Sequence, residues 1–194
     1  VNLYLATATA DRINRYGPHT WRGNSVEFVF SGPNVGSALS RDIPTSGTVG
    51  AAAFSTEIFS APAIDFSGTS EGRLPWNAAE VPLRSITYAK IATKFMNAIT
   101  DSGIPYLPIR TFLNVNFPKV EGDYTDSDKF KWVLSRFGPA AADEIRRRNL
   151  MTYYLTTETS VIYASDCHIS ISAGHSTDNS TARVEDEAVV LDRL

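Results

Sequence analysis

Two short polar segments in the first third of the chain carry residue types that bind metal ions and phosphate. Asn34 ends a Ser-Gly-Pro-Asn turn, and its amide oxygen is a suitable ligand for a hard divalent cation. Ser46, Gly47 and Thr48 precede a run of small residues that predicts a helix. The free N–H groups at a helix start, beside a glycine that allows close approach, form an anion site. We therefore predict a metal ligand at Asn34 and a phosphate site at residues 46–48.

The same residues also have a simpler structural explanation. Asn34 is a common turn residue, and Ser46 is a favourable N-cap for the helix that follows. Short motifs of this kind are frequent, so the pattern alone favours the structural explanation and leaves the functional one open.

The predicted elements around these segments form one β-α-β unit. Residues 26–30, Val-Glu-Phe-Val-Phe, are typical of a strand buried on both faces of a parallel sheet, and residues 31–34 should end it. Residues 47–59 predict a helix, and residues 63–66 predict a second strand. A right-handed crossover makes the two strands parallel, so both polar segments should lie at their carboxyl ends, where open α/β sheets bind ligands.

The rest of the chain predicts further elements around this unit. Apolar residues at helical spacing indicate helices over residues 3–16, 88–99 and 130–137. Residues 111–117 alternate as a strand does. Residues 156–172 are rich in Thr, Val, Ile and Tyr and predict a β-hairpin with its turn near Ser165 and Asp166.

Several motifs in a fixed order resemble those of the survival protein E (SurE) phosphatases. They are Ser-Gly-Pro-Asn-Val-Gly at 31–36, Ser-Gly-Thr-Val-Gly-Ala-Ala at 46–52 and Leu-Asn-Val-Asn-Phe-Pro at 113–118. The residues of these motifs are most similar to those of the secreted fungal acid phosphatase branch. The resemblance implies an α/β fold, with a three-layer, Rossmann-like, mostly parallel sheet and a C-terminal β-hairpin extension. It also implies hydrolysis of phosphate monoesters, nucleotides among them, with a divalent metal, Mg²⁺ or Mn²⁺.

The chain departs from this family at several positions. Family members begin with a strand that ends in Asn-Asp-Asp-Gly, whose aspartates are metal ligands, and nothing here matches it. We therefore expect residues 1–194 to form a single SurE-like domain without its N-terminal part, with a core over 1–150 and a hairpin and tail over 151–194. Ala38 replaces a frequent second asparagine, and Asp65 places a carboxylate in a strand expected to be buried.

Two functional classes remain open, and no catalytic residue is identified from the sequence. The chain is either the C-terminal part of a metal-dependent phosphomonoesterase, inactive as this chain alone, or a non-catalytic relative that binds or supports other molecules. An isolated hairpin is only marginally stable and an open sheet edge exposes unpaired backbone groups, so both require a packing partner. We therefore expect a homo-oligomer or association with a missing N-terminal fragment.

Charge, hydropathy and one short motif restrict the classes of partner and the cellular location that we expect. A net charge of −3 over 194 residues argues against DNA as a partner, and no apolar run reaches the length of a membrane span. The resemblance to the fungal branch predicts secretion, and one glycosylation sequon at Asn179 agrees with it.

Overall fold

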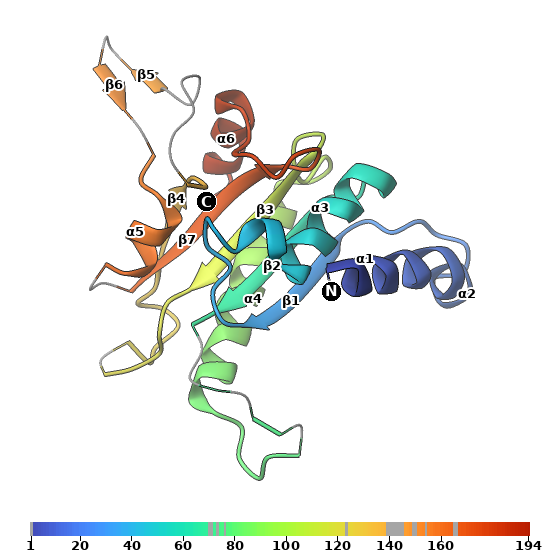
Figure 1. Cartoon of the computed structure of the whole chain (residues 1–194), viewed down its shortest axis with the longest axis horizontal. Helices are drawn as coiled ribbons and strands as arrows, with labels where there is room; N and C mark the ends of the chain where they lie inside the picture. Colours follow the sequence, from blue (N-terminus) through green and yellow to red (C-terminus); the bar gives the residue numbers. More distant parts are fainter. Residues whose placement is uncertain are drawn as a thin grey trace.

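The centre of the protein is a five-stranded sheet with the order β1-β2-β3-β7-β4 (Figure 1). The computed structural model describes residues 2–69, 72, 74–75, 77–122, 124–138, 146–148, 151–153, 155–164 and 167–194, and for residues 2–4, 146–148 and 151–153 it describes the backbone alone. The strands are β1 (Val29–Val35), β2 (Ala63–Gly68), β3 (Thr111–Phe117), β4 (Lys131–Ser135) and β7 (His168–His175). Strands β1, β2 and β3 are parallel, β7 is antiparallel to β3, and β4 is parallel to β7.

Helices cover both faces of this sheet, which gives three layers (Figure 1). On one face lie α3 (Gly47–Phe59) and α5 (Glu158–Ile162); on the other lie α4 (Leu83–Asp101) and α6 (Val184–Leu191). The N-terminal helix α1 (Asn2–Asp11) continues into a π-helical turn (Arg12–Tyr16) and α2 (Gly17–Thr20), and α1 packs on α3. The predicted α/β class with a mostly parallel sheet is confirmed. No helix in the described part of the chain is both long and apolar enough to cross a membrane.

The two faces of the central strands differ in polarity. Ile64, Phe66 and Val115 point to the α4 side and join the large apolar core. The alternate positions on the same strands point to the α3 side, where the outer part packs on apolar residues such as Val49 and Ala52. Nearer the carboxyl ends of β2 and β3, this α3 side becomes a layer of buried polar residues instead. Polar side chains buried on a sheet face need hydrogen-bond partners inside the protein, so each polar atom of this layer should have one.

The first strand differs from its prediction. β1 begins at Val29, continues through residues 31–34 and lies at the edge of the sheet, so it is not buried on both faces, and Phe30 is 42% exposed. Its register against β2 shifts between Ser31 and Asn34. Gly32 allows this because it adopts φ +108°, and a Cβ there would lie 2.4 Å from the Phe66 carbonyl oxygen. A run of β-branched and aromatic residues indicates a strand but does not tell an edge from a centre.

Two further predictions are wrong in type. Residues 130–137 contain β4 instead of a helix, and Phe130, Trp132 and Leu134 pack on the core with the period of two that a strand requires. Residues 156–172 do not form a hairpin but contain α5 and the start of β7, which pairs between β3 and β4. Thr157 starts α5, because its side chain accepts a hydrogen bond from the Ser160 N–H. The expected turn at Ser165 and Asp166 lies outside the described residues.

A two-stranded ribbon does occur, but earlier in the chain. It pairs β5 (Arg146–Arg148) with β6 (Met151–Tyr153) and stands apart from the main sheet (Figure 1). The helices predicted near residues 3–16, 47–59 and 88–99 and the strands near 63–66 and 111–117 are confirmed.

Candidate functional site

The two polar segments predicted from the sequence line one hollow of about 390 Å³. It lies where β1 ends and α3 begins, as the β-α-β argument requires. Its walls come from Asn34, Val35, Gly36, Ser37, Ala38, Asp42, Thr45, Ser46 and Gly47. The structure therefore brings Asn34 together with Ser46 and Gly47.

Asn34 presents an uncommitted oxygen. Its Nδ2 donates a hydrogen bond to the Gly36 carbonyl at 2.9 Å, which fixes the orientation of the amide. Among the described residues, no donor reaches its Oδ1. An oriented amide oxygen at the wall of a hollow can accept a hydrogen bond or bind a cation.

The N-terminus of α3 supplies N–H groups on the other side of this hollow. The Ser46 Oγ accepts from the Val49 N–H at 3.3 Å, and its carbonyl accepts the first helical hydrogen bond from Gly50. Ser46 therefore caps the helix, as the simpler explanation holds. The N–H groups of Gly47 and Thr48 lie in the first turn, which has no preceding carbonyl within the helix. These groups and the helix dipole favour an anion at this end.

Thr48 contributes differently from its two neighbours. Its side chain is buried, and its Cγ2 lies against the position that a Cβ on Gly32 would take. Its methyl group is thus turned toward β1, and Thr48 is not among the residues that line the hollow.

One candidate ligand was missed from the sequence. The Asp42 side chain is exposed at the hollow, directly before the short 3-10 turn Ile43–Thr45. An acidic residue between the two polar segments was the available signal. Asp42 offers a carboxylate and Asn34 an amide oxygen, and both are ligand types that Mg²⁺ accepts. In proteins Mg²⁺ also keeps several water molecules and phosphate oxygens of the substrate as ligands. No group of three His, Cys, Asp or Glu side chains that could hold a metal gathers in the described part of the chain.

The loop that carries these residues is held from beneath by two buried asparagines. The Ala38 N–H donates to the Asn116 Oδ1 at 2.8 Å, and the Ala38 carbonyl accepts from Asn114 and Asn116 at 2.9 and 3.1 Å. From the sequence, strand pairing was the favoured explanation for these asparagines, and an approach to a site was left open. Backbone atoms of residue 38 do the binding, while its side chain is buried.

A buried glutamate holds the next part of this loop. Glu158, at the start of α5, accepts hydrogen bonds from the Ser40 N–H and from the Asn114 Nδ2. Burial raises the pKa of Glu158 to about 7, although these donors act in the opposite direction. Burial also raises the pKa of Asp65 well above its ordinary value, and the charge of Glu158 adds to that rise.

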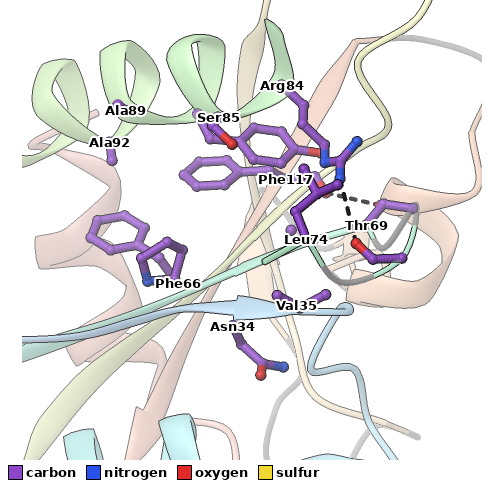
Figure 2. Close-up of a pocket in the computed structure, with 14 residues that line it drawn as sticks. Asn34, Val35, Phe66, Thr69, Leu74, Arg84, Ser85, Ala89, Ala92 and Phe117 are labelled. Carbon is purple, nitrogen blue, oxygen red and sulfur yellow. Dashed lines mark hydrogen bonds between the residues drawn. The ribbon is translucent and has the colours of Figure 1, made fainter. Parts of the chain in front are cut away.

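A second hollow, of about 370 Å³, lies on the α4 side of the same strand ends (Figure 2). Its walls are mainly apolar and include Phe66, Leu74, Tyr88, Ala89 and Phe117. Figure 2 shows the Asn34 side chain pointing away from this group. Asn34 and Val35 line both hollows, so the end of β1 separates a polar site from an apolar one.

Comparison with known proteins identifies the family. The family model described as survival protein SurE matches residues 4–139, more than half of the chain. The chain belongs to the SurE family. Two curated relatives are 36% identical to this SurE-family chain and are named 5'-nucleotidase SurE: one from Aliarcobacter butzleri over 101 residues and one from Acinetobacter baylyi over 94 residues.

The matched lengths differ between sequence and structure. The two relatives match 51% and 48% of the chain, and the chain covers only 36% and 34% of their own length. A crystal structure of the SurE protein from Aquifex aeolicus has a similar fold, with a TM-score of 0.60 at 20% identity, over 90% of this chain and 67% of that one. The SurE fold is therefore shown over most of the chain.

Proposed function

We propose that this SurE-family chain carries the phosphate-binding part, and part of the metal site, of a phosphomonoesterase that acts on nucleoside monophosphates. The observation that carries the proposal is the shared hollow, into which the Asn34 amide and the N-terminus of α3 both open. The names of the two curated relatives support the substrate class.

Each group has a separate role in this proposal. The first-turn N–H groups of α3 orient the phosphate, and Gly47 leaves room for its oxygens. Asn34 and Asp42 hold Mg²⁺ or Mn²⁺. When bound, such a cation supplies positive charge to the phosphoryl group and makes water acidic enough to act as a nucleophile. The hydrogen bonds from Asn114 and Asn116 to Ala38 keep the loop in place while this occurs.

The organic part of the substrate belongs in the apolar hollow. Tyr88 and Phe117 stack there with ring centroids 5.0 Å apart, and flat apolar walls of this kind suit a nucleobase. Adenosine monophosphate should therefore bind more tightly than inorganic phosphate. Ala89→Phe, which fills the exposed side of that hollow, should reduce the difference in affinity between adenosine monophosphate and phosphate. Thr93→Phe, on the exposed surface of the same helix, should leave that difference unchanged.

We expect this chain by itself to be inactive. One carboxylate and one amide oxygen supply too little negative charge and too few ligands for tight binding of a hard cation. The family resemblance assigns the remaining ligands to an Asp-Asp segment in an N-terminal part. The isolated chain should hydrolyse p-nitrophenyl phosphate or adenosine monophosphate no faster than buffer that contains the metal. Metal-dependent turnover by a homogeneous preparation would contradict this expectation.

Phosphate binding is the experiment that tests the site. Isothermal titration with inorganic phosphate should give binding to the wild-type chain and none to Gly47→Val, because the added side chain blocks approach to the N–H groups. Ile58→Val, at the exposed end of the same helix, should bind like the wild type. Equal affinity in Gly47→Val and in the wild type would place the anion elsewhere.

A non-catalytic role is the second candidate, favoured because Asp42 is the one acidic residue among the described residues that line the hollow. The enzymatic and the non-catalytic roles predict different polypeptides in protein purified from its source. Intact-mass measurement and N-terminal sequencing of every purified component should find a companion fragment with an Asp-Asp pair if the protein is an enzyme. A single species that begins at residue 1 would favour the binding role.

Secretion, and kinship with the secreted fungal branch, belong to the same proposal. The sequon residue Asn179 is half-buried in a polar turn that follows β7. Protein purified from its source should lose mass on treatment with an endoglycosidase, and an unchanged mass would remove this support for secretion.

A further inference from the structure

The sheet face beneath the candidate site contains polar residues where a core would normally be apolar. Asp65 on β2, Asn114 on β3 and Ser172 on β7 are cross-strand neighbours in one row, and all three are 0% exposed. Ser67 and Asn116 form part of the next row and are also 0% exposed. Neither hollow described above includes Asp65 or Glu158 in its walls.

Asp65 and Ser67 stand out in this layer because they lack partners. Among the described residues, neither carboxylate oxygen of Asp65 has a hydrogen-bond partner, and neither does the Ser67 Oγ. The two residues are two positions apart on β2, so their side chains point to the same face of the sheet. A buried carboxylate with no donor is among the most unfavourable arrangements in a protein interior.

The surrounding amides are already committed to other groups. Asn114 donates through Nδ2 to Glu158 and to the Ala38 carbonyl, while its Oδ1 accepts from Asn116 at 3.1 Å. Asn114 donates to Glu158 and is the cross-strand neighbour of Asp65, and the charge of Glu158 acts on Asp65, so the two acidic residues lie near each other. The atoms left without partners are therefore the two Asp65 carboxyl oxygens and the Ser67 hydroxyl oxygen, with the Glu158 carboxyl group nearby.

We propose that Asp65, Ser67 and Glu158 form a buried binding site for a divalent cation, Ca²⁺, on the α3 side of the sheet. A proton shared by the carboxyl groups would satisfy one oxygen, whereas a cation can contact both Asp65 oxygens, the Ser67 hydroxyl and a Glu158 oxygen together. Oxygen ligands with two negative charges are those of a hard cation. Ca²⁺ accepts irregular geometry and bidentate carboxylates, whereas Mg²⁺ requires a near-octahedral shell and keeps several waters.

This site differs from the one proposed for catalysis. Its two carboxylates come from β2 and α5, whereas Asn34 and Asp42 line the hollow above the loop. Ser67 is the cross-strand neighbour of Asn34, so the two sites lie on adjacent strands and the experiment must separate them. The calcium proposal does not depend on phosphatase activity. Its role is structural, because it ties α5 to the sheet beneath the loop.

The test uses the intact chain after treatment with EDTA. At pH 8, addition of CaCl₂ should raise the thermal unfolding temperature by several degrees, more than the same concentration of MgCl₂ does. Native mass spectrometry should find one calcium ion per chain. Asp65→Asn and Glu158→Gln keep the side-chain shapes and should lose both effects, while Asn34→Ala should keep both.

Three results would overturn the proposal. They are a wild-type chain with neither bound calcium nor a calcium-dependent shift, a shift of equal size in Asp65→Asn, and loss of the shift in Asn34→Ala. If Asp65→Asn does not fold, Ser67→Ala serves in its place and should weaken calcium binding in a titration followed by mass spectrometry. Unchanged calcium affinity in Ser67→Ala would then count against the site.

Discussion

At the scale of single residues, the candidate metal site depends on one amide whose oxygen is not engaged by other groups. Asn34 fixes its own orientation by donating to Gly36, and Asp42 brings a negative charge to the same hollow. The affinity of such a site for a hard cation increases with the number of charged ligands. A change that adds charge without changing shape is therefore informative.

Asn34→Asp should bind Mn²⁺ at least several-fold more tightly than the wild-type chain, and Asn34→Ala should bind it more weakly. The carboxylate has almost the shape of the amide and adds a charge next to Asp42. Titration followed by the paramagnetic relaxation of water would measure the affinity. Asn97→Asp, on the exposed side of α4, is the matched control and should not change it. Equal affinities in Asn34→Asp and Asn97→Asp would remove Asn34 from the site.

The buried carboxyl groups predict a dependence of stability on pH. The pKa of Glu158 is raised from 4.5 to about 7, chiefly by burial. Between these two values the folded protein keeps a proton that the unfolded chain has lost, so stability is highest below the ordinary pKa and falls as the pH rises. One pKa unit corresponds to about 1.4 kcal/mol, so the loss should be roughly 3 kcal/mol by pH 7, with Asp65 acting in the same direction.

Urea unfolding in EDTA, from about pH 5 to about pH 8, would measure this loss. Glu158→Gln has no proton to lose and should give a flatter profile. A wild-type profile as flat as that of Glu158→Gln would show that burial does not perturb this glutamate. Calcium, if it binds as proposed, should reduce the loss at the upper end of the range.

At the scale of secondary-structure elements, α3 serves both the fold and the site. Its buried face, with Val49, Ala52 and Ala53, packs on the sheet, while its first turn faces the polar hollow. Ser46 connects these roles, because the cap that starts the helix also sets the direction of the first N–H groups. Capping and phosphate binding are thus compatible at this residue.

Ser46→Ala should lower the free energy of unfolding by about 1 kcal/mol, the usual effect of losing an N-cap side chain. It should weaken phosphate binding less than Gly47→Val does, because the backbone N–H groups remain. Urea denaturation and phosphate titration would separate the two effects. Ser85→Ala, in the exposed first turn of α4, is the control and should change neither. A wild-type stability in Ser46→Ala would show that the cap is dispensable.

At the scale of the whole molecule, one edge of the sheet, formed by β1, carries exposed apolar side chains. β1 is the first strand in the order of the sheet, so in the described part of the chain no strand pairs with its outer side. Phe30 and Val35 on this strand are 42% and 57% exposed. An exposed edge with apolar side chains is a template for pairing with another chain. The hairpin that we expected over residues 156–172 gives no such argument, because those residues belong to α5 and the main sheet.

We predict that the chain forms a homodimer or a larger assembly through the β1 edge. Light scattering after gel filtration should give a mass at least twice that of one chain. Phe30→Lys should favour the monomer, because a charge on an edge strand opposes pairing, while Ile58→Lys on α3 should not. A stable wild-type monomer at micromolar concentration would contradict this prediction.

The sequence by itself determined the β-α-β unit, the α4 helix, the β3 strand and the family. These features depend on local signals: the Ser46 cap, the apolar period of α4 and the alternation of β3. The same signals placed Asn34 and residues 46–48 at one end of the sheet, because parallel strands bring their carboxyl ends together. Local patterns of this kind are decided by neighbours within a few residues along the chain.

Only the tertiary structure decided which strand is at the edge, and which polar atoms meet. Phe130 and Leu134 fit a helix or a strand equally well by spacing, and the open position beside β7 selected the strand. Glu158 lies 118 residues from Ser40 and 44 from Asn114, yet it hydrogen-bonds to both. No pattern in the sequence predicts such contacts, because sheet order brings these residues together and each depends on partners that are distant along the chain.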